Sequence, residues 1–175
     1  MCKESEVKYA QFFVDWLNNA YNLDYQTHAN QEENSAVDVY AVSKSRNPDL
    51  QLQLVTSGGP TMRMADINTR RLEQNEEFIV EDVEWERWIM EAIKKKNERY
   101  SLAVKQGLIL LIEGCLPTPD PEWVKETFQS FSRLEFKGIY YVSPPIISSS
   151  KTNYARDGFV VIIKDAYGQL PEPQP

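Results

Sequence analysis

The feature that most constrains the fold is a short apolar run, Leu108–Ile112, in which every residue is leucine or isoleucine. The run is far shorter than the roughly 20 residues that a membrane-spanning helix needs. It also lacks the polar residues at alternate positions that a strand with one face in water would carry. We therefore expect a central β-strand over 107–113 that is buried on both faces, with helices covering the two sides of the sheet.

Two long segments have the three-and-four spacing of apolar residues that is typical of a helix packed along one face. The first covers 4–21 and the second covers 83–100. A third helix is predicted over 121–132, because Asp120 can cap its first turn and Pro121 suits the first helical position.

The remaining strands are predicted from alternating apolar residues and from short aromatic and β-branched runs. In chain order they cover 23–29, 35–43, 50–56, 137–143 and 159–163. A turn signal at 46–49 joins two of them into an antiparallel hairpin. The polar stretch 61–81 predicts either a short helix around 66–73 or a long surface excursion. The resulting order, αβββαβαββ, indicates an α/β fold with a mixed central sheet flanked by helices.

The composition excludes several classes of protein. A chain of 175 residues with a net charge of −7 is not a generally basic nucleic-acid coat protein, although a local basic groove remains compatible with it. The polar and charged start predicts no secretory leader, and we expect a cytoplasmic protein without a membrane span. A single domain is predicted over 1–168, followed by a flexible Pro-rich tail over 169–175. No Gly-rich phosphate loop supports a nucleotide-dependent α/β enzyme.

The charge is unevenly distributed along the chain. Acidic residues concentrate over 73–86, whereas basic residues gather in two places, 63–71 and 94–99. Nucleic-acid phosphates are bound by such basic clusters. The residues Arg63, Arg70 and Arg71 are therefore candidates for nucleic-acid binding, with solvated surface charge as the alternative.

The predicted element order resembles that of the PD-(D/E)xK nuclease superfamily, the restriction-endonuclease-like fold, over roughly 4–143. The family pattern has an acid on the second strand and E-x-K or Q-x-K on the third, and spacing i, i+2 puts both side chains on one face. Asp38 matches the second-strand acid within Ala-Val-Asp-Val-Tyr. The third strand offers two registers, Gln51-Leu52-Gln53 and Gln53-Leu54-Val55.

Neither register supplies the lysine of the family pattern. Some members place this lysine on the following helix, where Lys96 points with the apolar face. Glu6 matches the glutamate that the family often carries on its first helix.

The resemblance implies hydrolysis of phosphodiester bonds in nucleic acid. It also implies Mg²⁺ (or Mn²⁺) held by Glu6, Asp38 and Gln53, with Asp38, Gln53 and Lys96 as catalytic residues. The incomplete pattern leaves open a catalytically inactive module that acts by binding protein or nucleic acid.

Each of these residues also has an ordinary structural interpretation. Asp38 could cap a turn or pair with a lysine, and Gln53 could lie on a half-solvated sheet face. Glu6 could be a first-turn acid favoured by the helix dipole. Lys96 could run its stem along the apolar face and keep its amine in water.

Overall fold

The computed structural model describes residues 3–32, 35–55, 82–114, 120–145 and 157–167. Its centre is a six-stranded mixed sheet in which the strands lie side by side in sequence order. The strands are β1 (Tyr25–Ala29), β2 (Val39–Ser43), β3 (Leu50–Val55), β4 (Leu108–Glu113), β5 (Gly138–Ser143) and β6 (Phe159–Lys164).

The strand directions change along the sheet. β1, β2 and β3 form an antiparallel meander, β3, β4 and β5 run parallel to one another, and β6 is antiparallel to β5. Parallel neighbours need crossover connections, and these contain helices here. As a consequence, the carboxyl ends of β3, β4 and β5 meet at one edge of the sheet.

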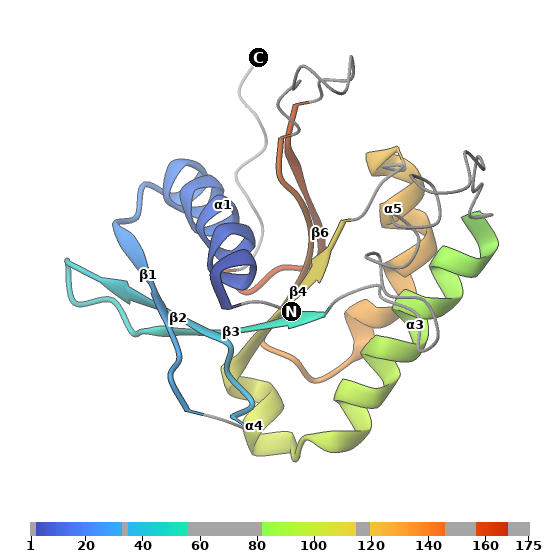
Figure 1. Ribbon diagram of the computed structural model, residues 1–175, viewed down its shortest axis with the longest axis horizontal. Helices are drawn as coiled ribbons and strands as arrows, with labels where there is room; N and C mark the ends of the chain where they lie inside the picture. The colour runs from blue at the N-terminus through green and yellow to red at the C-terminus, as the bar shows by residue number, and fades with distance from the viewer. Residues whose placement is uncertain (1–2, 33–34, 56–81, 115–119, 146–156, 168–175) are drawn as a thin grey trace, which may run out of the picture.

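Helices cover both faces of the sheet (Figure 1). α1 (Lys3–Tyr21) lies on one face, and α3 (Asp82–Arg99) lies on the other with α5 (Pro121–Phe128) and the 3₁₀ turn η1 (Gln129–Arg133). A short helix, α4 (Leu102–Gly107), connects α3 to β4.

Strand β4 divides the apolar core into two halves, as its sequence predicts. Its side chains alternate between the two helix layers, and those of Leu108–Ile112 are all buried. Leu108, Leu110 and Ile112 join the core under α3 and α5, whereas Ile109 and Leu111 join the core under α1. The expectation of a central strand buried on both faces is confirmed.

The predicted strand over 35–43 is too long, because β2 begins only at Val39. The preceding residues are held by polar side chains and by two backbone hydrogen bonds of Asp38, without the regular ladder of a strand. The Asn30 side chain donates to the Val37 carbonyl at 2.8 Å, and the Val37 N–H donates to the Ser35 hydroxyl at 3.1 Å. Such local bonds compete with regular pairing. Asp38 therefore lies just before β2 and not within it.

The helix α4 was not predicted, and β4 begins at Leu108 because this helix ends at Gly107. Ser101 caps α4 by accepting a hydrogen bond from the Val104 N–H at 3.5 Å. None of the six residues of α4 is buried, so its sequence carries no apolar periodicity. The predicted helix over 121–132 is also corrected, since its α-helical part ends at Phe128 and η1 follows.

Three expectations concern parts of the chain that are not described: the stretch 61–81, the tail 169–175 and the arginines at 63, 70 and 71. Among the helices that are described, none is both long enough and apolar enough to span a membrane.

Candidate functional site

Asp38 and Gln53 are neighbours across the β2–β3 pairing. Val39 pairs with Leu52 at the start of the β2–β3 ladder. The Asp38 N–H also donates to the Leu52 carbonyl at 2.9 Å, which is one residue out of that register, so the pairing is irregular at Asp38. Gln53 faces the layer that contains α3, since Leu52 and Leu54 on either side of it pack under α1. Its amide meets the Asp38 carboxylate there.

The Asp38 carboxylate accepts two hydrogen bonds from the neighbouring strand. Its Oδ2 atom accepts from the Leu54 N–H at 2.8 Å and from the Nε2 amide of Gln53. Burial raises the pKa of Asp38, and this effect is opposed by the Leu54 N–H, by the charge of Lys96 and by the Gln53 amide. The half-buried carboxylate is thus oriented by fixed donors.

Gln53 is buried and fully hydrogen-bonded, with only 1 % of its surface exposed. Besides Asp38, its Nε2 atom donates to the Leu54 carbonyl at 3.3 Å, and its Oε1 atom accepts from the Tyr100 hydroxyl at 2.7 Å. The interpretation of Gln53 as a residue on a half-solvated face is wrong. Amides with every polar atom paired are expected at buried positions, because an unpaired one is costly.

The positions of Gln51 and Gln53 distinguish the two registers that the sequence leaves open on the third strand. Gln51 is exposed and lies opposite Tyr40, whereas Gln53 lies beside Asp38. The triplet Gln53-Leu54-Val55 therefore has its first residue at the carboxylate. Its third residue, Val55, is 1 % exposed and packs with Ile89 and Ile93 of α3. The strand thus presents an apolar side chain where the family pattern has lysine.

Lys96 supplies a cation to this region from α3. The residue is half-buried, and burial lowers its pKa, an effect opposed by the negative charges of Asp38 and Glu6. Neighbouring Lys94 and Lys95 are exposed, as the helical pattern predicts. Its partial burial agrees with the sequence prediction that Lys96 points with the apolar face of this helix.

Glu6 lies near this group, on the first turns of α1. Its carboxylate raises the pKa of Lys96 and also that of Glu113 at the end of β4. Because the carboxyl ends of β3 and β4 meet at one edge, Glu113 belongs to the same region of the sheet. Burial raises the pKa of Glu113, and a hydrogen bond with Tyr9 opposes that effect.

Sequence reasoning missed Glu113 as a candidate, although a signal for it was present. An acidic residue at the end of a strand that is otherwise leucine and isoleucine is unusual, since isolated charges are rarely buried. The parallel arrangement that brings this residue toward the site depends on the β3–β4 crossover. Glu113 therefore becomes recognisable only when the strand order is considered.

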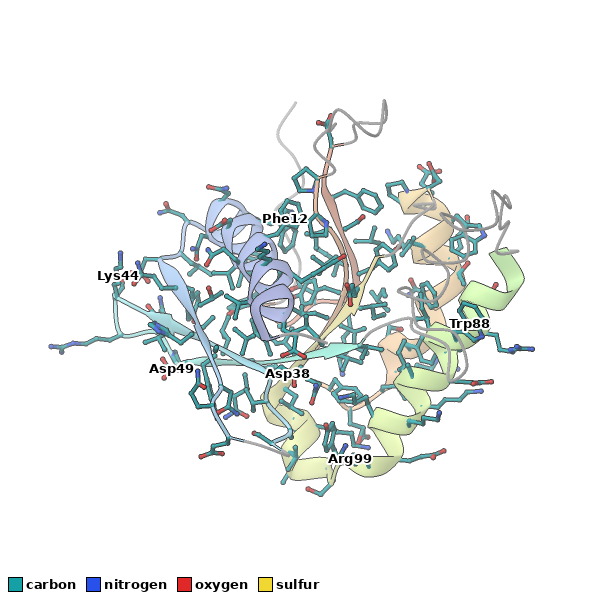
Figure 2. The ribbon with its side chains drawn as sticks, in the orientation of Figure 1. Phe12, Asp38, Lys44, Asp49, Trp88 and Arg99 are labelled. Atoms are coloured by element: carbon teal, nitrogen blue, oxygen red, sulfur yellow. The ribbon has the colours of Figure 1, made fainter. Side chains whose placement is uncertain are left out.

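Tyr100 and Arg99 were also missed as site residues. Tyr100 follows the end of α3, and its peptide N–H donates to the Lys96 carbonyl at 3.3 Å. The Lys96 Nζ atom lies 6.0 Å from the centre of the Tyr100 ring, and the Arg99 guanidinium carbon lies 5.8 Å from it. Figure 2 shows Asp38 near the centre of the molecule and Arg99 near the end of α3.

The atoms around Asp38 include oxygen atoms that could bind a divalent cation. Asp38 contributes a carboxylate, and the Leu54 carbonyl and the Gln53 amide contribute further oxygen atoms, the atom type that Mg²⁺ prefers. The Gln53 amide currently turns its nitrogen toward these oxygens, so its oxygen would face a cation only after rotation. No group of three or more His, Cys, Asp or Glu side chains suited to a metal occurs among the described residues. These oxygen atoms are of the kind that Mg²⁺ binds, and within the Asp38–Gln53 pair the only carboxylate is that of Asp38.

Comparison of the chain with protein-family models, with curated proteins and with solved structures found no match. The functional inference therefore rests on the residues of the site.

Proposed function

We propose that this protein is a nuclease of the restriction-endonuclease-like fold, which hydrolyses phosphodiester bonds in nucleic acid at Asp38, Gln53 and Lys96. The observation that carries the proposal is the meeting of these three side chains on one side of the sheet. They come from the residue just before β2, from β3 and from α3. Gln53 follows Asp38 by 15 residues, and Lys96 follows Gln53 by 43.

The element order supports the same proposal. A helix, an antiparallel meander of three strands, a helical crossover and a strand parallel to the third are the arrangement that the family resemblance implies. Fold alone does not establish an activity, so the proposal depends on the side chains.

Hydrolysis of a phosphodiester requires a positioned water molecule and stabilisation of the negative charge that develops on the phosphate oxygens. Lys96 would provide a cation for that charge, and its partial burial strengthens its electrostatic effect. Asp38 would accept a hydrogen bond from the attacking water through its carboxylate, which the Leu54 N–H and the Gln53 amide orient.

Asp38 would hold Mg²⁺ or Mn²⁺, with Glu6 as a further ligand from α1. Gln53 would join them through its amide oxygen only after that oxygen left the Tyr100 hydroxyl. When bound, such an ion polarises the phosphate and lowers the pKa of a coordinated water.

A second candidate function is a catalytically inactive module that binds a protein or a nucleic acid. The observation that favours it is Val55, which is packed in the apolar core at the position of the family lysine. In this case the Asp38–Gln53–Tyr100 hydrogen bonds serve to satisfy buried polar groups.

The test is cleavage of single- and double-stranded DNA and RNA in the presence of Mg²⁺ or Mn²⁺. Wild type is compared with Asp38→Ala and with Asp49→Ala, a matched control at an exposed position before β3 (Figure 2). We expect metal-dependent cutting by the wild type and the control, and its loss in Asp38→Ala.

Isothermal titration of the same proteins with MgCl₂ and MnCl₂ gives a second readout. We expect binding heat that disappears in Asp38→Ala. The absence of both cutting and metal binding in the wild type would refute the nuclease proposal and favour the inactive module.

A further inference from the structure

The hydrogen bond between Tyr100 and Gln53 determines which way the Gln53 amide faces. A phenol hydroxyl at neutral pH donates its proton, and Gln53 Oε1 accepts this hydrogen bond at 2.7 Å. With Oε1 engaged in this way, the Nε2 donor must face Asp38 and the Leu54 carbonyl.

The ring of Tyr100 has a second set of neighbours, which are both cationic. The Lys96 Nζ atom and the Arg99 guanidinium carbon lie 6.0 and 5.8 Å from the ring centre. Cations at such distances are attracted by an aromatic ring. The positive charge of Arg99 lowers the pKa of Lys96, so the two cations repel each other while both are attracted by the ring between them.

Hydrogen bonds of Tyr100 and Lys105 hold the end of α3 in place next to Tyr100. The Tyr100 N–H bonds to the Lys96 carbonyl, which fixes these two residues one helical turn apart. Helix α4 begins directly after Tyr100, and its Lys105 amine donates to the carbonyl of Asn97 at 3.3 Å and to the Oδ1 atom of Asn97 at 3.0 Å. Tyr100 is thus held between two helices that are tied to each other.

From these contacts we infer that Tyr100 is a positioning residue of the site. Its hydroxyl fixes the Gln53 amide, and through that amide the Asp38 carboxylate, while its ring holds Lys96 at the same place. The catalytic part of this inference rests on the proposed function. The positioning itself is measurable whether or not the protein cuts nucleic acid.

The decisive variant is Tyr100→Phe, which removes the hydroxyl and keeps the ring. Tyr25→Phe is the matched control, because the Tyr25 hydroxyl also bonds a partner, the Pro48 carbonyl at 2.9 Å, on the α1 side of the sheet. Nuclear magnetic resonance at a fixed pH follows the side-chain amide of Gln53 and the carboxyl carbon of Asp38 in each protein.

We expect Tyr100→Phe to shift the Gln53 side-chain amide resonances and the Asp38 carboxyl carbon resonance, with neither effect in Tyr25→Phe. Unchanged Gln53 and Asp38 resonances in a folded Tyr100→Phe would overturn the inference. Tyr100→Leu removes the ring as well. The side-chain resonances of Lys96 should shift in that variant and not in Tyr100→Phe, and equal behaviour of the two would show that the ring positions nothing.

The kinetic readout separates this inference from the proposed function. If the wild type cuts nucleic acid, Tyr100→Phe should lower kcat about tenfold and keep KM within about threefold, as expected when a transition-state interaction is lost. A fall in kcat no larger than that of Tyr25→Phe would contradict positioning for catalysis. If the wild type does not cut, the proposed function fails, and the resonance measurements still decide whether Tyr100 positions Gln53.

Discussion

Replacement of Gln53 by glutamate tests how much a second carboxyl group beside Asp38 lowers the free energy of unfolding. Gln53→Glu keeps the shape of the side chain and places a second carboxyl group beside Asp38, where Gln53 Nε2 now donates to the Asp38 carboxylate. Two charged carboxylates about 4 Å apart repel by about 4 kcal/mol at an effective dielectric constant of about 20. The pair can avoid this repulsion by keeping one proton, which then replaces the lost Nε2–H donor.

The cost of keeping that proton depends on pH. Holding a carboxyl of ordinary pKa about 4.3 protonated costs about 1.36 × (7 − 4.3), or about 3.7 kcal/mol, at pH 7 and about 1 kcal/mol at pH 5. Repulsion between two charged carboxylates and retention of one proton each lower the free energy of unfolding by about 3–4 kcal/mol at pH 7. The folded-state pKa of the pair lies above its unfolded value, so stability is present at low pH and is lost as pH rises. Burial already raises the pKa of Asp38, in the same direction.

The assay is urea unfolding of wild type and Gln53→Glu at pH 5 and pH 7, each with and without MgCl₂. Gln51→Glu is the matched control, because Gln51 lies on the same face of β3 and is exposed. We expect a large destabilisation at pH 7 that shrinks at pH 5 and is reversed by Mg²⁺, and no such pattern in the control. A Gln53→Glu protein as stable as the control at pH 7 would refute the buried, charge-coupled environment that the geometry indicates.

Two further predictions concern the scaffold. Leu110→Ala, at a fully buried position of β4, should lower the free energy of unfolding by about 2–5 kcal/mol in the same urea titration. The control Leu102→Ala, at a position 50 % exposed, should change the free energy of unfolding by less than about 0.5 kcal/mol. Asp165→Ala should lower the thermal midpoint more than Tyr21→Phe, because the Asp165 carboxylate accepts from the Tyr21 and Tyr140 hydroxyls at 3.1 and 3.0 Å and its loss leaves both of these protons without their acceptor. Equal midpoints would contradict this.

The parts of the fold that were predictable are those whose own sequence carries the constraint. The apolar faces of α1 and α3 and the uniform apolarity of β4 reflect burial, and burial dictates residue type position by position. α4 could not be predicted in this way, because it buries none of its residues and depends on the Ser101 cap. The late start of β2 depends on bonds made by Asn30 and Ser35, which polar composition alone does not reveal.

The site was predictable in part for a related reason. Asp38 and Gln53 stand out because each is a polar residue in an apolar strand context, which is uncommon unless the polar group has a partner. Tyr100 does not stand out, since an aromatic residue on the apolar face of a helix is what packing alone requires. Its role depends on the 2.7 Å contact of its hydroxyl with Gln53, a residue on another element, and no local pattern encodes that contact.

The packing of α3 on β3 explains how a cation can reach Asp38 without a lysine on the strand. Val55 lies in the core with Ile89 and Ile93, so the strand position nearest the helix is filled by an apolar side chain. Lys96 follows Ile93 by three residues and therefore lies on the same face of α3, directed at the same layer of the sheet. A lysine introduced by Val55→Lys would have to displace Ile89 or Ile93 from this core, whereas Lys96 keeps its stem along the helix surface. Supplying the cation from the helix is thus compatible with the packed strand, and this is why the missing strand lysine does not by itself argue against a functional site.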